Sequence, residues 1–151
     1  MNKKIKHYIN DVLSERRAEF GGKAVCPFAA PELEADRLMI AKVGDKSLID
    51  LIDEFTDSDY ESALFIIEED IPAEQTKKFQ HFVNRLLKDR GAENYKNICF
   101  NPNDDVAVEE FNPRALAPHF MVNIADKKVL SKDCPFKTSF SLLTWCLFSF
   151  N

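Results

Sequence analysis

The sequence predicts a single domain of the α/β (α+β) class over residues 1–151, with three helices packed on a mixed β-sheet of about five strands. Apolar residues recur at helical spacing in three segments. Short apolar runs lie between them, so that strands and helices alternate over residues 36–101 before strands dominate. A chain of 151 residues that is 45% hydrophobic and contains 13 phenylalanines can bury one substantial core.

Three helices are expected from the spacing of apolar residues. They are Lys3–Phe20, a short helix that begins at Ser47, and a long helix from Pro72 to about Arg90. Gly21-Gly22 follows the first helix and Gly91 follows the third, and glycine commonly ends a helix. Asp50 lies three residues after Ser47, which makes a partial capping box at the start of the second helix.

Five strands are expected between and after these helices. They are Arg37–Val43, Ala63–Ile67, Asn97–Phe100, His119–Ile124 and Phe140–Phe150. The last segment is apolar on both faces, which indicates a buried strand, with a helical segment as the alternative. An apolar strand at this position must be covered by the domain or by another subunit, so a homodimer is also expected. Loops are predicted at Cys26–Pro31 and at Asn101–Pro118.

The charge distribution excludes several partners. The net charge is −5, and residues 32–70 hold 13 acidic and 3 basic residues, which leaves no basic patch for DNA or RNA. The first ten residues lack the apolar core of a signal peptide. The longest uncharged run, Thr138–Asn151, is shorter than the roughly 20 residues that span a bilayer. We therefore expect a cytoplasmic protein without membrane or nucleic-acid partners.

Cysteine and histidine provide the first candidates for chemistry. The four cysteines form no Cys-x-x-Cys pair, so a structural zinc site is not expected. Pro27 holds Cys26 in an extended conformation, and a thiolate fixed at a pocket mouth can ligate heme iron or act as a nucleophile. His119 follows Pro118 and precedes an apolar strand, where it is a candidate ligand or acid–base group. The alternatives are a buried thiol in a turn and a strand-end histidine bonded to backbone.

An acidic loop follows the third predicted strand. It contains Asp104, Asp105, Glu109 and Glu110, with Arg114 nearby. Carboxylates in this position can hold an amine or a guanidinium, and the arginine can bind a carboxylate with two hydrogen bonds. The alternative is a solvated acidic loop without a ligand.

Five phenylalanines adjoin or lie close to proline-containing elements, and a pocket is expected among them. They are Phe28, Phe100, Phe111, Phe120 and Phe136.

The Cys-Pro-Phe-Ala motif at Cys26–Ala29 resembles that of a family of small bacterial proteins of unknown function. The resemblance extends over roughly residues 5–125 and rests on the order and spacing of elements. The matching segments are Cys26–Ala29, Arg37–Val43, Leu48–Phe55, Ala63–Ile67, Thr76–Arg90, Phe100-Asn101-Pro102 and Pro118–Ile124. Asn101 stands where that family has the histidine of a Phe-His-Pro motif.

A more distant resemblance links the Cys-Pro-Phe motif to the YqcI/YcgG family. Some of its members are similar to heme-dependent enzymes that hydroxylate nitrogen on arginine-like amino acids. The resemblance implies a heme monooxygenase for a small amine or guanidine, with Cys26 or His119 as the axial ligand. The porphyrin would then pack against Phe28, Phe100 and Phe120, and the substrate would be held by Asn101, Asp104, Asp105, Glu109 and Arg114.

Two other functions stay open on the sequence alone. The first is a non-catalytic module on the same scaffold that binds a small molecule or a protein, and Asn101 in place of the histidine favours it. The second is thiol chemistry at Cys26 without a cofactor, where Lys23 is the one basic residue nearby.

Overall fold

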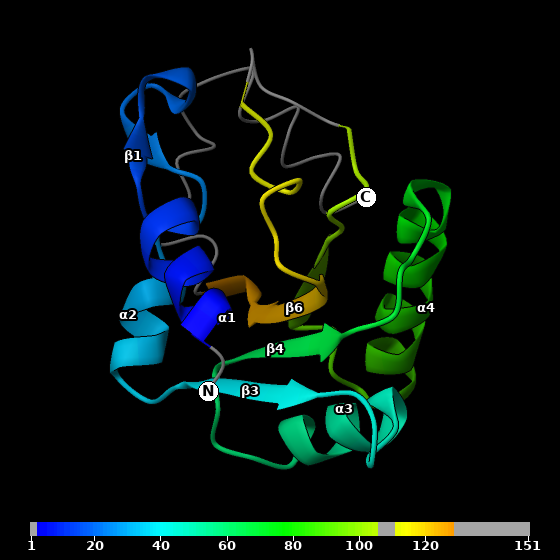
Figure 1. Ribbon diagram of the computed structural model, residues 1–151. Coiled ribbons are helices and arrows are strands. Elements are labelled where there is room, and N and C mark those ends of the chain that lie inside the picture. The colour runs from blue at the N-terminus through cyan, green and yellow to red at the C-terminus, as the bar shows by residue number, and fades with distance from the viewer. Residues whose placement is uncertain (1–2, 106–110, 129–151) are drawn as a thin grey trace.

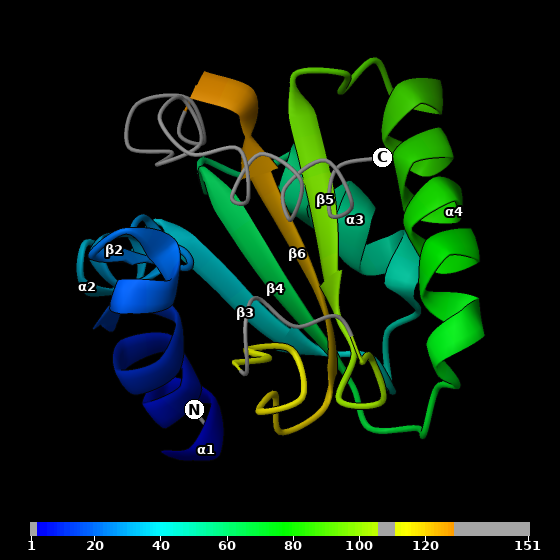
Figure 2. The ribbon, with the colours of Figure 1, turned by 90° about the horizontal axis from the view of Figure 1, so that it is seen from above.

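The computed structural model describes residues 3–105 and 111–128. Within these ranges a four-stranded mixed sheet lies between two layers of helices (Figures 1 and 2). The strands are β3 (Leu38–Lys42), β4 (Ser62–Ile67), β5 (Tyr95–Phe100) and β6 (Phe120–Asp126). This architecture confirms the predicted fold class. The predicted strand Phe140–Phe150 lies outside the described residues.

The sheet order is β3-β4-β6-β5, so that β6 lies between β4 and β5. Strands β3 and β4 are parallel and are joined through a helix, whereas β6 is antiparallel to both of its neighbours. In the register of the central pair, Ser62 lies opposite Ala125 and Ile67 lies opposite Phe120. Strands β3 and β5 therefore form the two edges of this sheet.

Helices cover both faces of the sheet (Figure 2). On one face lie α1 (Lys3–His7) and α2 (Ala29–Glu34), and on the other lie α3 (Leu48–Thr56) and α4 (Thr76–Asp89). Side chains of a strand alternate between faces, so Leu64 packs with the α1–α2 layer and Phe65 packs with the α3–α4 layer. Every residue of β4 is buried because both of its faces are covered.

The second and third predicted helices form as expected from local signals. The Ser47 hydroxyl accepts a hydrogen bond from the Asp50 backbone N–H at 3.1 Å, which caps α3. Helix α4 buries Val83 and Leu87 toward the sheet. Gly91 follows α4 with a φ of +68°, a conformation that glycine adopts without a steric penalty.

The predicted first helix, Lys3–Phe20, is wrong beyond Leu13. Helix α1 continues as a π-helical segment over Tyr8–Leu13 and then ends. The Leu13 carbonyl accepts a hydrogen bond from the Cys26 N–H at 2.9 Å, a partner distant in sequence. The Ser14 hydroxyl donates to the Ile9 carbonyl at 2.7 Å. Both contacts use carbonyls at the end of the helix, so the chain leaves helical geometry there.

A short hairpin replaces the rest of that helix. Strand β1 (Arg16–Arg17) pairs antiparallel with β2 (Lys23–Ala24). Gly21 and Gly22 lie in the connection with φ values of +65° and +78°. The two glycines therefore make a turn between paired strands.

The predicted loop at Cys26–Pro31 is also partly wrong, because it contains the start of α2 (Ala29–Glu34). Pro31 is the third residue of this helix, where the absent N–H loses no hydrogen bond within the helix. Among the described residues, no helix has the length and apolar character needed to cross a membrane.

Candidate functional site

Cys26, the predicted axial ligand, is only 6% exposed and belongs to the apolar cluster between α1, α2 and the sheet. Its backbone is fixed by the hydrogen bond to Leu13. The neighbouring Tyr8 is also buried and donates a hydrogen bond from its hydroxyl to the Pro113 carbonyl at 2.8 Å. Burial, with a smaller contribution from Cys26, raises the pKa of Tyr8 above its ordinary value, so the phenol stays protonated.

His119, the other predicted axial ligand, lies directly before β6. It is half-buried. The sheet register places Ile67 opposite Phe120, so the preceding His119 is close to Glu68, which follows β4. The pKa of Glu68 is lowered, mainly by a hydrogen bond from Lys42 and in smaller part by His119. His119 is thus part of a polar strand end.

The predicted heme-binding residues lie on two different faces of the sheet. Cys26, Phe28 and Phe100 belong to the cluster beneath α1 and α2. Phe120 belongs to the opposite cluster, where its ring lies 5.0 Å from that of Phe79 in α4. One porphyrin cannot pack against both faces of a continuous sheet. In this arrangement the candidate residues do not fit a heme.

The expected aromatic cluster divides in the same way. Phe111 packs against the cluster that contains Phe28 and Phe100, whereas Phe120 is separated from them by the sheet. Phe136 lies outside the described residues.

The predicted substrate-binding acid and arginine bind each other. Arg114 Nη1 donates to Asp104 Oδ2 at 2.7 Å, where the Arg114 side chain is buried and the Asp104 side chain is 11% exposed. Asn112 supports the pair, because its amide donates to the Asp104 carbonyl at 2.6 Å and its oxygen accepts from the Arg114 N–H at 3.1 Å. The guanidinium held by Asp104 is therefore one from the chain itself. Asp105 is exposed, and Glu109 lies outside the described residues.

Asn101 is completely buried and has a structural set of partners. Its side-chain amide donates to the Ile71 carbonyl at 2.9 Å and to the Thr76 hydroxyl at 2.8 Å. Its side-chain oxygen accepts from the Asn103 N–H at 2.9 Å. These bonds tie the end of β5 to the start of α4, so Asn101 has little hydrogen-bonding capacity left for a substrate.

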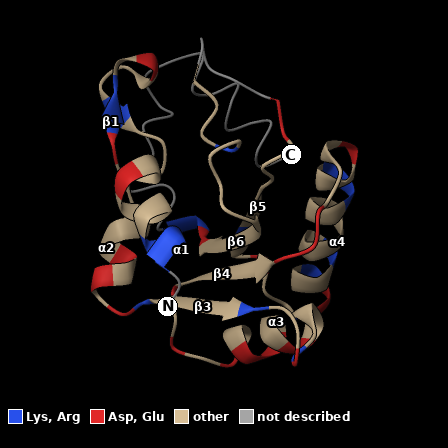
Figure 3. Cartoon of the chain, in the orientation of Figure 1, with Lys and Arg blue, Asp and Glu red and all other residues tan. Residues whose placement is uncertain are grey.

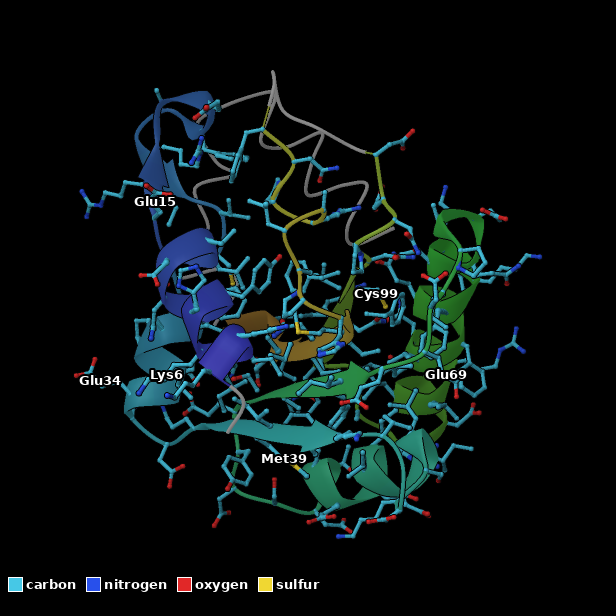
Figure 4. All side chains as sticks on the ribbon, in the orientation of Figure 1. Lys6, Glu15, Glu34, Met39, Glu69 and Cys99 are labelled. Atoms are coloured by element: carbon cyan, nitrogen blue, oxygen red, sulfur yellow. The ribbon has the colours of Figure 1, made fainter. Side chains whose placement is uncertain are left out.

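A different feature has the properties of a binding site, namely the free edge of β3. A cavity of about 530 Å³ runs along this edge. It is lined by Met39, Ile40, Ala41, Lys42, Gly44, Asp45, Lys46, Leu51, Glu54 and Tyr60. The residues come from β3, the loop that follows it, α3 and the segment before β4. Figure 4 shows Met39 pointing from β3 toward α3.

The backbone of β3 presents hydrogen-bonding groups to this cavity. The Arg37 carbonyl and the Val43 N–H both bond to residues of β4 and its preceding turn. Because backbone groups alternate in direction along a strand, the N–H and C=O groups of Ile40 and Lys42 point away from β4. No strand of the described residues pairs with β3 on that side.

The opposite edge of the sheet is protected. The Cys99 N–H on β5 donates to the Gln80 Oε1 of α4 at 3.0 Å. The Asn97 amide donates to the Gln80 carbonyl at 3.0 Å and to Asn84 Oδ1 at 2.5 Å. Figure 4 shows Cys99 on the side of β5 that faces α4. Groups of α4 thus form hydrogen bonds with polar groups at the edge of β5. No element of the described residues forms such bonds with the outer edge of β3.

The surroundings of the β3 edge are acidic. Its two lysines are neutralised within the chain, because Lys42 pairs with Glu68 at 2.9 Å and Lys46 pairs with Glu54 at 2.7 Å. Asp45, Asp50 and Asp57 form no ion pair with other described residues. Figure 3 shows acidic residues on and around α3, with basic residues on α1 and α4.

Comparison with known proteins identified no relative of this chain. No model of a protein family, no curated protein and no solved structure matches this chain. The resemblances to the Cys-Pro-Phe-Ala and YqcI/YcgG families therefore stay predictions from sequence.

The open edge of β3 could not be recognised from the sequence. The alternation in Arg37–Val43 indicated a strand, but which strands are edges depends on the order of pairing. The local excess of acids over residues 32–70 was visible and is the one signal that pointed to this region.

Proposed function

We propose that this protein is a non-catalytic interaction module that binds an extended, basic peptide by adding it as a strand to β3. The observation that carries the proposal is the cavity along β3 into which the backbone groups of Ile40 and Lys42 point. A non-catalytic binding module was one of the alternatives that the sequence allowed.

The hydrogen-bonding pattern favours an extended peptide as the ligand. Ile40 and Lys42 each offer one donor and one acceptor, and the two sets are about 6.6 Å apart along the strand. In an added peptide strand, the N–H and C=O groups on one side recur at the same spacing. Such a strand can therefore bond with Ile40 and Lys42 at the same time. Peptide recognition at open sheet edges commonly uses these main-chain bonds for affinity and side-chain pockets for specificity.

The side chains around the edge favour alternating apolar and basic residues in that peptide. Leu51 and Met39 give the cavity an apolar floor. Tyr60 lines the same cavity with an aromatic ring, which can attract a cation across its face. The unpaired Asp45 lies at the rim, and further acids on α3 extend the negative potential.

The acidic surroundings disfavour a second copy of this chain as the occupant. Residues 32–70 carry a net charge of −10. Pairing β3 with β3 of another copy would bring two such segments together, and like charges across an interface oppose association. A basic partner removes this repulsion.

Two synthetic peptides test the proposal. One alternates valine and lysine, the other alternates valine and glutamate, and both are six residues long and blocked at their ends. We expect the lysine peptide to shift the amide resonances of Ile40 and Lys42 most strongly and to protect them from hydrogen exchange. The glutamate peptide should bind at least tenfold more weakly.

An Ile40→Pro variant removes one outward N–H without removing a bond to β4, since edge positions tolerate proline. It should weaken the lysine peptide at least fivefold, while Ile40→Val, which keeps the N–H, should bind normally. Lys42→Pro provides a second variant if Ile40→Pro unfolds. Equal binding of the lysine peptide to the folded proline variants, or equal affinity for both peptides, would overturn the proposal.

A further inference from the structure

A second cavity, of about 470 Å³, lies between the N-terminal helix and the segment before β6. Its lining consists of Lys3, Lys4, His7, Tyr8, Val12, Leu116 and Pro118. None of these residues belongs to the β3 edge, so a ligand here is independent of the strand-addition proposal. The volume is within the range of about 300–1,000 Å³ that is usual for small-molecule sites.

Contacts of Tyr8 with other parts of the chain fix the walls of this cavity. The Tyr8 hydroxyl is bonded to the Pro113 carbonyl, which joins the helix to the chain segment that forms the opposite wall. The Tyr8 ring also contacts Phe100 at the end of β5, with ring centres 6.0 Å apart. The cavity is therefore built on a buried, aromatic base.

The helix changes geometry at the cavity. The α-helical turn ends at His7, and the π-helical segment begins at Tyr8. Short π-helical segments cost stability and are frequent at functional sites. Here the segment carries Tyr8 and Val12 on the cavity side.

One large apolar side chain is exposed at the cavity. Leu116 is 55% exposed, although most leucines of the described chain are buried or partly buried. With Val12 and Pro118 it gives the cavity a mainly apolar wall. A ligand with an apolar portion would remove this surface from water.

Positive charge is concentrated at one end of the cavity. Lys3 and Lys4 lie at the start of α1, whereas Val12 lies near the end of the π-helical segment that follows it. His7 lies between them and contacts the Asp11 carboxylate at 2.5 Å. Residues 1–31 carry a net charge of +3, opposite in sign to the β3 region.

From these observations we infer that the cavity binds a small organic acid with an unbranched apolar chain. Its carboxylate lies against Lys3 and Lys4, and its chain lies along Val12, Leu116 and Pro118. A lysine ammonium attracts a carboxylate as a point charge, and the apolar wall supplies the hydrophobic contribution.

Decanoate, below its micelle concentration, is a suitable probe. We expect saturable binding by calorimetry, with chemical-shift changes at Val12 and Leu116. Decanol has the same chain without the charge and should bind at least fivefold more weakly. Lys3→Gln combined with Lys4→Gln should weaken decanoate binding about fivefold.

Two matched controls separate the site from general surface effects. Lys6→Gln removes a charge from the same helix at a residue that does not line the cavity, and it should leave the affinity unchanged. Leu116→Glu should weaken binding at least tenfold, whereas Ile49→Glu, at another exposed apolar residue, should not.

Three results with decanoate and decanol in solution would overturn the inference. They are the absence of saturable decanoate binding to the folded protein, equal affinity for decanol, and an equal loss of affinity in Lys6→Gln. Binding that appears only with phospholipid vesicles would instead indicate a membrane surface as the partner and would also overturn it.

Discussion

The Arg114 guanidinium donates a hydrogen bond to the Asp104 carboxylate over 2.7 Å, in a position where both side chains are shielded from water. The pair joins the segment after β5 to the segment before β6. Both charged groups belong to this chain, so the ion pair contributes to the stability of the fold. Removal of one partner takes away the opposite charge of this pair while the other group stays shielded from water, which is more costly than removal of both.

Asp104→Ala should therefore lower the free energy of unfolding by about 3–5 kcal/mol. The double variant Asp104→Ala with Arg114→Met should be more stable than Asp104→Ala alone. Urea denaturation of both variants measures the difference. A single variant that is as stable as the double variant would contradict this account of the pair.

Asn101→Ala should lower the free energy of unfolding by about 1–3 kcal/mol, because the buried Thr76 hydroxyl loses this donor and the Ile71 carbonyl keeps only the hydrogen bond from the Asn103 amide. Asn101→His, which restores the Phe-His-Pro motif, should also destabilise the chain, since the side chain has no space at this buried position. Thermal unfolding measures both. A stabilised histidine variant would show that this site accepts the family residue.

Glu32 should make stability depend on pH. It is buried in α2, one of its carboxylate oxygens has no hydrogen-bond partner among the described residues, and burial raises its pKa despite the contact with Arg37. A carboxyl group with a raised folded pKa contributes stability below its unfolded pKa of about 4.3, and this contribution is lost as the pH rises through the folded pKa.

Glu32→Gln should accordingly be more stable than the parent protein at pH 7, and the difference should shrink below about pH 4. Glu34→Gln is the matched control, because Glu34 is on the same helix and points away from the protein (Figure 4). Urea midpoints across this pH range provide the measurement. A Glu32→Gln variant that is less stable at neutral pH would mean that the contact with Arg37 outweighs burial.

The separation of the heme candidates also has a measurable consequence. Titration with hemin should give no absorption band that depends on Cys26, because the thiol is packed among apolar side chains and Phe120 lies across the sheet. Cys26→Ala and His119→Ala should leave the spectrum unchanged. A Soret band that disappears in Cys26→Ala would restore the N-oxygenase hypothesis.

Elements with local signals were predictable from sequence. The Ser47 cap and the spacing of Val83 and Leu87 each depend on residues within a few positions, and both helices form as expected. The first helix was overestimated because its end depends on the hydrogen bond between Leu13 and Cys26. That contact forms only when a distant segment packs against the helix.

The placement of the candidate residues could not be predicted for a related reason. Phe100 and Phe120 each lie two residues from a proline, but the pairing of β5 with β6 places their side chains in different layers. Likewise, Asp104 and Arg114 are both compatible with ligand binding until their mutual contact is known. Composition shows which groups are present, whereas the register of the sheet decides which of them meet.

The position of β6 between β4 and β5 sets the order in which this protein can assemble. Strand β6 is the last of the four along the chain and joins β5 to the β3–β4 pair, with Ser62 of β4 opposite Ala125 of β6. On the ribosome, β5 has no strand to pair with until β6 has emerged. Strands β3 and β4 can pair earlier, but the four-stranded sheet is complete only after β6 has been synthesised, so a chain that stops before residue 120 should leave β5 without its partner strand.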